Sequence, residues 1–247
     1  MKFTQPTPIA NSDHPAIQTL IQDRRWDQLT TPKARIGAAY HFVKDELPFG
    51  YNASDDLAAS AVLTDGYGQC NTKGNLLVAL LRALDIPTRF HGFKIDKHLQ
   101  KGAIPAWMYP LAPQRILHSW VEVYDEDQWI PLEGFILDAQ YLGALQQRFA
   151  DHQGAFCGYG VATKDLHNPD VNWTGKPTYI QREGIVEDLG VFDHPDDLYA
   201  KVGTNLRGPK RWLYQQLFRH LMNRTVNTIR NTPKARTTTP VHLPTPK

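Results

Sequence analysis

The chain has 247 residues, of which 41% are hydrophobic and 21% charged, and its net charge is +2. These values are ordinary for a globular protein with a sizeable core, in one substantial domain or two small ones. No apolar run reaches the roughly 18 residues of a membrane span, and no secretory signal follows the first residues. The two cysteines are too few for a disulfide framework, which favours a cytoplasmic location.

Charge is unevenly distributed along the chain. From Leu198 onward there are 10 basic residues and no Asp or Glu, whereas the preceding part carries 17 basic and 25 acidic residues. The basic part therefore either offers a surface to an anionic partner or packs on the acidic face of the protein itself. Because no nucleic-acid-binding signature accompanies the charge, nucleic acid is not the favoured partner.

The first half of the chain predicts two helices and a strand. Thr31-Pro32 opens an amphipathic helical pattern. A second, strongly apolar helix begins at Cys70 and ends before Pro87, because a residue that precedes proline avoids helical geometry. Residues 88–95 then have the composition of a strand.

The middle of the chain predicts a β-hairpin followed by a helix. Residues 97–114 contain three prolines and are expected to form a surface loop. Residues 116–124 alternate β-branched and aromatic side chains, and 129–133 form the return strand after a turn at 125–128. A helix is expected over 139–149.

The C-terminal third is less regular. Residues 154–199 are rich in Gly, Pro, Asp and aromatic side chains without sustained periodicity, so we expect an ordered, irregular extension that shapes a pocket wall. Residues 209–230 predict an amphipathic basic helix, and 232–247 lack core formers. The apolar stripe of this helix comprises Leu213, Leu217 and Leu221, extended by Met222.

These patterns predict three parts. Residues 1–205 form one domain, with the irregular extension starting at about 150. Residues 206–230 form the basic helix that packs on it, and 231–247 form a disordered tail.

Cys70 stands at the start of the apolar helix, directly after the glycine turn Asp65-Gly-Tyr-Gly68. A thiol at that position meets backbone N–H groups without intrahelical acceptors and the positive end of the helix dipole. Both stabilise the thiolate, which is the nucleophilic form. The alternative is a small core cysteine. The other cysteine, Cys157, has no helix behind it and is expected to be buried or part of a pocket wall.

His118 is the leading candidate for the base that a nucleophilic thiol needs. A hairpin loop with an even number of residues pairs Tyr124 with Trp129 and places Glu133 diagonally opposite His118 on the same face, about 7 Å away. An odd-numbered loop would remove Glu133 from the site. Asp138 has the wrong parity and lies beyond the strand, so Glu133 is the preferred carboxylate. Two other histidines, His91 and His98, are alternative bases with core or surface roles favoured.

Several residues could complete the site. Gly74 lies one turn after Cys70 on the same helix face, so a strand can approach the helix there. The backbone N–H of Cys70 supplies one donor of an oxyanion hole. Tyr51 and Asn52 are candidates for the second donor, and Trp120 for a substrate contact that shields the thiolate.

Three blocks of sequence resemble, in the same order, the transglutaminase-like superfamily. They are Gly68-Gln-Cys70 with its leucine-rich helix, His118-Ser-Trp-Val-Glu-Val-Tyr124 and Trp129-Ile-Pro-Leu-Glu133. The resemblance covers 33–138. It implies an α+β, papain-like core in which the nucleophile helix packs on an antiparallel sheet, with Cys70 as nucleophile and His118 as base. The family usually has Asp where this chain has Glu133, which keeps the charge but adds a methylene.

The resemblance implies machinery rather than a substrate, since the family includes cross-linking enzymes, proteases, peptide N-glycanases, acyltransferases and inactive scaffolds. We expect a cysteine-dependent acyl-transfer enzyme that hydrolyses an amide or peptide bond through a thioester on Cys70. Water is always present and no acidic pocket for an amine can be identified. The alternatives are an amide-forming acyltransferase or transglutaminase, and an inactive binding or scaffold protein. No cofactor is expected, because zinc-ligand spacings, a phosphate loop and a dinucleotide fingerprint are missing from the sequence.

Overall fold

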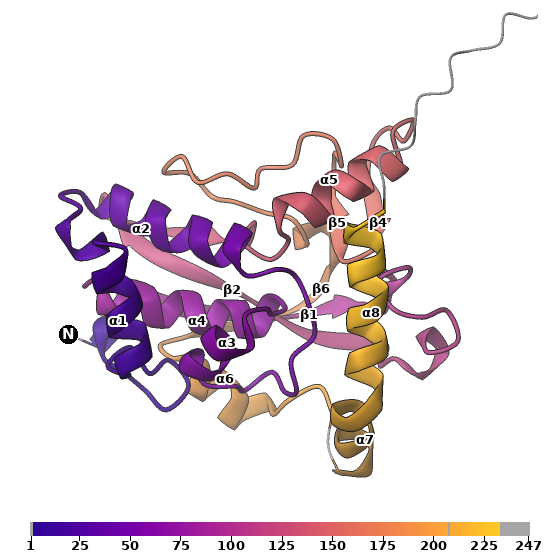
Figure 1. The fold of residues 1–247 in the computed structure, drawn as a ribbon, viewed down its shortest axis with the longest axis horizontal. Coiled ribbons are helices and arrows are strands. Elements are labelled where there is room, and N and C mark those ends of the chain that lie inside the picture. The colour runs from indigo at the N-terminus through magenta and orange to yellow at the C-terminus, as the bar shows by residue number, and fades with distance from the viewer. Residues whose placement is uncertain (1, 207, 233–247) are drawn as a thin grey trace, which may run out of the picture.

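The computed structural model describes residues 2–206 and 208–232. Its centre is a four-stranded antiparallel sheet with strand order β3-β2-β1-β6, against which helices pack (Figure 1). The expected α+β fold class is therefore confirmed. The strands of this sheet are β1 (Thr88–Asp96), β2 (Arg115–Asp125), β3 (Gln128–Leu132) and β6 (Ile185–Phe192).

Helix α4 (Cys70–Ala83) is the centre of the core. It packs on β1 and β2, and every residue from Cys70 to Arg82 is buried. Such burial on all sides explains why residues 76–81 form an unbroken apolar run rather than a single apolar stripe. Figure 1 shows the other N-terminal helices gathered around it. These are α1 (Pro15–Asp23), α2 (Pro32–His41), which a π-helical segment extends over Phe42–Glu46, and α3 (Ala59–Asp65).

The β2–β3 hairpin has the predicted register. Tyr124 pairs with Trp129, and Val121 pairs with Leu132. The loop has two residues, Glu126 and Asp127, with φ values of 47° and 62°. Positive φ at both positions is the geometry of the tight hairpin turns whose twist matches that of the strands.

The segment 154–199 is more regular than its sequence suggests. It contains a small hairpin of β4 (Phe156–Gly158) and β5 (Val161–Thr163), then β6 of the central sheet and helix α6 (Pro195–Val202). The expectation of an irregular extension is wrong for these strands and this helix, whereas Gly160 and Gln181 do form part of a pocket wall, as expected. The pairing of β6 with β1 contains two register shifts, which disrupt the period-two alternation that identifies a strand in a sequence.

The C-terminal part forms consecutive helical segments, the last of which packs against α5 (Ala139–Arg148). They are α7 (Gly208–Leu213), a π-helical segment (Tyr214–Phe218) and α8 (Arg219–Arg230). The predicted apolar stripe is wrong in its first half, because Leu213 and Leu217 are 38% and 46% exposed. The wider π-helical turn changes which face points inward, and α8 buries Met222, Val226 and Ile229 instead.

Two further expectations concern the ends of the chain and membranes. The predicted disordered tail, except for residues 231 and 232, lies outside the described residues. Over residues 2–206 and 208–232, no helix has the length and apolar character required to cross a membrane.

Candidate active site

Cys70 is the first residue of α4 and is 9% exposed. Its backbone N–H has no intrahelical acceptor, because the first N–H groups of a helix lack one. The turn before the helix is tied to it by Gln69, whose N–H donates to Thr72 Oγ1 at 3.0 Å and whose carbonyl accepts from the Lys73 N–H at 2.8 Å. The sulfur is therefore held at the positive end of a rigid, buried helix.

His118 and Glu133 form a fully buried pair. His118 Nε2 lies 2.7 Å from Glu133 Oε1, and both side chains are 0% exposed. The other carboxylate oxygen, Glu133 Oε2, accepts the backbone N–H groups of three consecutive residues, Ile180, Gln181 and Arg182, at 2.8–3.0 Å. The carboxylate is thus fixed by four contacts, one of which orients the imidazole.

The second nitrogen of the imidazole, Nδ1, is buried and has no hydrogen-bond partner among the described residues. Burial alone would lower the pKa of His118, but Cys70 and Glu133, both next to the ring, together raise it to about 10. Because Nε2 is engaged by Glu133, Nδ1 is the ring nitrogen that remains able to exchange a proton. The structure thus brings together the three residues that the sequence singled out, and their catalytic roles remain a proposal.

The Asp55 carboxylate links the first residues of α4 to Asn205 through hydrogen bonds. Its Oδ1 accepts from Gln69 Nε2 and Asn71 Nδ2, both at 3.1 Å, and its Oδ2 accepts the backbone N–H and side-chain amide of Asn205, both at 3.0 Å. These four donors saturate the carboxylate. No sequence pattern indicates this role, because Asn205 lies 150 residues after Asp55 in the chain.

Asn71 extends this network to strand β2. Its side-chain amide also donates to the Leu117 carbonyl at 3.0 Å, and its oxygen accepts from Ser119 Oγ at 2.8 Å. Leu117 and Ser119 flank His118 in the chain. The residue after the nucleophile is therefore hydrogen-bonded to both neighbours of the imidazole, which fixes α4 relative to β2.

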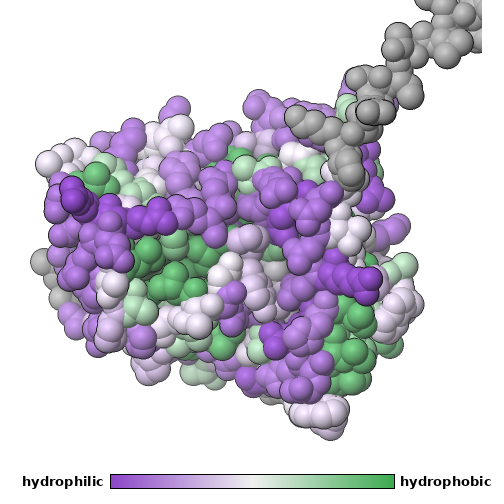
Figure 2. Space-filling model, in the orientation of Figure 1, coloured by the Kyte–Doolittle hydropathy of each residue, from purple (hydrophilic) through white to green (hydrophobic). Residues whose placement is uncertain are grey.

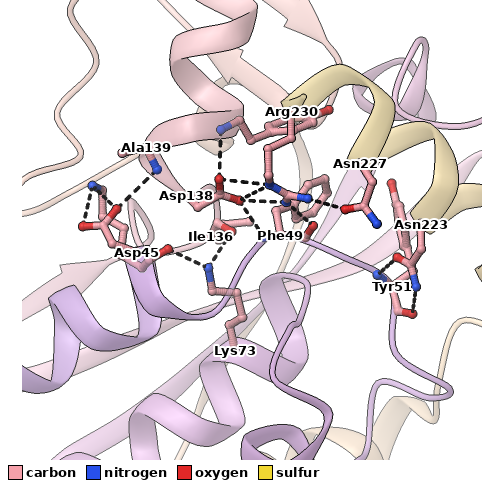
Figure 3. Close-up of polar contacts among 12 residues, drawn as sticks. Asp45, Phe49, Tyr51, Lys73, Ile136, Asp138, Ala139, Asn223, Asn227 and Arg230 are labelled. Carbon is pink, nitrogen blue, oxygen red and sulfur yellow. Dashed lines mark hydrogen bonds and ion pairs between the residues drawn. The ribbon is translucent and has the colours of Figure 1, made fainter. Parts of the chain in front are cut away.

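Asp138, the rejected carboxylate, has a structural role. It accepts from Arg230 on α8, from the Phe49 N–H at 2.8 Å and from the Tyr141 N–H at 2.9 Å (Figure 3). Burial opposes its ionisation, but Arg230 and these two N–H groups hold the pKa of Asp138 below its ordinary value. This buried ion pair joins α8 to the start of α5.

Figure 3 also shows two groups of hydrogen bonds near the same ion pair. The ammonium of Lys73, one turn after Cys70, is fully buried and donates to the carbonyls of Lys44 and Ile136 at 3.2 and 3.0 Å. Asn223 of α8 holds the backbone of Tyr51 through two hydrogen bonds, at 2.6 and 3.0 Å. Helix α8 therefore positions Tyr51.

The three candidates for oxyanion or substrate contacts lie in different settings. Burial, and then the charge of the nearby Cys70, raise the pKa of Tyr51, so its hydroxyl keeps its proton and can donate. The amide of Asn52 is already engaged, donating to Asp65 and to the Tyr67 carbonyl. The indole N–H of Trp120 donates to Glu122 at 3.1 Å. Of the three, only Tyr51 lines the cavity next to Cys70.

The other cysteine and histidines lie elsewhere. Cys157 is exposed, which corrects the expectation of burial, because β4 is a short strand of a small hairpin with this side chain on its outer side. His91 bonds Glu122 and Asp188, and His98 is exposed beside Asp96. Within the described ranges, no group of three or more His, Cys, Asp or Glu side chains is placed to hold a metal ion.

A cavity of about 350 Å³ opens beside Cys70, Asn71 and Gln181. Its walls come from the 97–117 region and from α7 and α8, and most of its lining side chains are apolar. The C-terminal helices are therefore part of the wall of the site. Hydrophobic patterning in the sequence identified these helices as amphipathic but not what they cover.

Residues 22–134 match the family model described as the transglutaminase-like superfamily. Over this segment the chain resembles that superfamily. The matched segment includes Cys70, His118 and Glu133, and ends before the C-terminal helices that complete the cavity.

Two solved structures are similar. A candidate cysteine protease of Cytophaga hutchinsonii aligns with a TM-score of 0.45 and 15% identity, over 79% of this chain and 47% of that protein. This chain thus spans about half of that protein's length. Red sea bream transglutaminase aligns with a TM-score of 0.29 and 17% identity, over 40% of this chain and 21% of the enzyme. Comparison with curated proteins gave no match.

Proposed function

We propose that the protein is a cysteine-dependent acyl-transfer enzyme that hydrolyses an amide bond through a thioester on Cys70. The observation that carries this proposal is the buried His118–Glu133 pair, 2.7 Å apart, whose unbonded Nδ1 belongs to a ring with its pKa raised by Cys70. In this proposal Cys70 is the nucleophile, His118 the base and Glu133 the carboxylate that orients the base.

In the first half-reaction, the Cys70 thiolate attacks the carbonyl carbon of the substrate and forms a C–S bond. The His118 imidazolium protonates the nitrogen of the leaving amine, and the C–N bond breaks. The negative charge on the tetrahedral oxygen is stabilised by the N–H of Cys70 and the hydroxyl of Tyr51. Glu133 keeps the ring oriented and offsets the charge of the imidazolium.

In the second half-reaction, neutral His118 takes a proton from water, which attacks the thioester carbon. The C–S bond breaks, the carboxylic acid leaves, and the thiolate–imidazolium pair is restored. Hydrolysis is favoured over transfer to an amine by the state of Asp55. It is the one acidic side chain among the described residues that line the cavity, and its four hydrogen bonds leave no lone pair for an incoming ammonium group.

The test is detection of the acyl-enzyme. The Cys157→Ser variant, which retains a single cysteine, is incubated with a library of amides and thioesters and analysed by intact and peptide mass spectrometry. We expect an acyl adduct on Cys70 that decays to free acid, and no turnover after Cys70→Ala. If every responsive substrate is converted equally by Cys70→Ala, the proposal is wrong. Added primary amines that capture the acyl group would instead favour the acyltransferase alternative.

A further inference from the structure

The cavity beside Cys70 has mainly apolar walls that come from two separate parts of the chain. Leu99, Ile104, Met108 and Leu117 line one side, and Leu213 and Met222 line the other. A polar side chain placed among them would lose its hydrogen bonds to water without replacement, which is unfavourable. At about 350 Å³, the cavity lies within the range of small-molecule sites.

One polar atom at this cavity has no partner. Gln181 is 3% exposed and lines the cavity, its amide N–H donates to the Gly160 carbonyl at 2.7 Å, and its Oε1 is buried without a hydrogen bond to any described residue. Buried acceptors are rarely left unpaired. The backbone N–H of Gln181 is one of the three that hold Glu133, and its side chain lines the same cavity as Cys70. An N–H of a bound amide would satisfy it.

The rim of the cavity is basic. Lys210 and Arg211 of α7 line it, with Lys210 exposed to solvent and Arg211 3.5 Å from Asp56. The acidic lining residue, Asp55, is buried and saturated by hydrogen bonds. A substrate that reaches this rim therefore meets positive charge, and a negatively charged group is the one that it attracts.

We propose that the cavity holds an apolar acyl group and that the substrate is an amide of this acyl group in a molecule that also carries a negative charge. This inference rests on the proposed function. The acyl chain lies between the 97–117 region and α8, the amide N–H bonds Gln181 Oε1, and the anionic group lies at Lys210. Exposed Trp107, Leu111 and Trp212, which are 58%, 66% and 64% exposed, belong to the same two regions, and Figure 2 shows apolar surface near α7.

The first experiment measures binding and turnover separately. N-alkanoylglycines from butanoyl to dodecanoyl are titrated into the Cys70→Ala variant by calorimetry, and the release of glycine by the unmodified chain is followed in parallel. We expect the dissociation constant to fall about fourfold for each added methylene until the cavity is full. Binding with this dependence but without turnover would keep the assigned ligand class and count against the hydrolase. Turnover of amides without any dependence on chain length would overturn the inferred acyl site and would still support the proposed hydrolase activity.

The second experiment uses matched variants. Leu213→Asp places a charge in the cavity, whereas Leu217→Asp changes a similarly exposed leucine of the same helical region that does not line it. We expect Leu213→Asp to weaken binding of N-dodecanoylglycine at least tenfold, and Leu217→Asp to have little effect. Equal effects of the two variants would contradict the assigned acyl site.

The third experiment tests the charge at the rim. N-dodecanoylglycine is compared with its neutral primary amide in Lys210→Glu, with Lys201→Glu of α6 as the control. We expect Lys210→Glu to remove the preference for the anionic compound. A preference that persists in Lys210→Glu, or that is missing from the unmodified chain, would overturn the anionic part of the inference. Weaker binding of a Gln181→Leu variant to these amides, but not to dodecanoate, would support the amide contact.

Discussion

Glu133 has a longer side chain than the Asp that is usual in the transglutaminase-like superfamily, and in this structure the additional length lets it reach two sets of partners. One of its oxygens bonds the His118 ring, while the other accepts three backbone N–H groups from the loop at 180–182. The additional methylene lets a single carboxylate span both partners. The hairpin register could be predicted from the sequence, because paired residues share a face. The contact with the loop at 180–182 could not be predicted, because no local pattern indicates that a segment more than 40 residues further along the chain approaches Glu133.

Glu133→Gln tests the orienting role at the residue scale. Glutamine keeps the size of the side chain but offers one acceptor oxygen for four donors, and it removes a charge that helps to raise the pKa of His118. We expect kcat for amide hydrolysis to fall by about 10²- to 10⁴-fold. Glu133→Asp, which keeps the charge, should lose less. Unchanged kcat in Glu133→Gln would exclude the role.

At the scale of elements, Gly74 fits a close approach between α4 and β1. A Cβ at this position would lie 3.0 Å from Phe90 Cε2 and 3.3 Å from Phe90 Cζ, and Phe90 is fully buried. The sequence predicted a strand close to the helix here, and the Phe90 ring on β1 provides that contact.

Gly74→Ala is expected to destabilise the protein. Alanine favours the helix by about 1 kcal/mol, but overpacking against a core ring costs about 1–3 kcal/mol. Gly143→Ala in α5 is the matched control, because a Cβ there meets nothing within 4 Å and only the gain in helix propensity remains. Urea unfolding measures the stability of both variants. A Gly74→Ala protein as stable as Gly143→Ala would show that Phe90 can move away.

The attachment of α8 depends on Arg230. This guanidinium bonds Asp138, the Phe49 carbonyl and Asn227, and is 8% exposed. The sequence predicted an amphipathic basic helix but not that one of its arginines is buried, because a charge at a core position is visible only once its partner is known.

Arg230→Met should lower the free energy of unfolding by about 3–5 kcal/mol, because it leaves the Asp138 charge buried without its counter-ion. Exposed Arg224 of the same helix offers the control, and Arg224→Met should change stability by less than about 0.5 kcal/mol. Both values are measured by urea denaturation. Similar effects of the two substitutions would indicate that the ion pair does not stabilise the fold.

For the whole molecule, two buried groups give opposite pH dependences of stability. Burial lowers the pKa of Lys73 to about 7, although Asp138 and Asp45 raise it in part and Lys44 and Arg230 lower it further. Because the unfolded chain binds this proton more tightly, stability from Lys73 rises with pH between about 7 and 10.5. The pKa of His118 is raised to about 10, so its contribution is complete below 6.5 and is lost as pH rises through 10.

Lys73→Met removes the contribution to stability that rises with pH. Relative to the unmodified chain, its free energy of unfolding should fall more steeply between pH 7 and 10, by up to about 1.4 kcal/mol per pH unit. His118→Asn should change the slope in the other direction. Urea unfolding at several pH values measures the slopes. Parallel profiles for Lys73→Met and the unmodified chain would show that this ammonium is not forced to lose its proton on folding.

The site as a whole could be predicted only where it lies on regular elements. The start of α4 and the β2–β3 hairpin follow from helix signals and period-two alternation. They carry Cys70 and His118, and Glu133 is the first residue after β3. The Asp55 network, the loop at 180–182 and the wall formed by α7 and α8 arise from contacts between distant segments. Periodicity describes one element at a time and does not identify its partner.

The central claim is that His118 and Glu133 keep the Cys70 sulfur reactive at neutral pH, and alkylation by iodoacetamide tests it most directly. Peptide mass spectrometry follows Cys70 and Cys157 in one sample from pH 5 to 9. Cys157 is a reference thiol, because partial burial and then Asp96 raise its pKa. We predict that Cys70 reacts readily at pH 6 and that His118→Ala slows it at least tenfold there. If Cys70 and Cys157 follow the same pH profile and His118→Ala changes neither, the claim is contradicted.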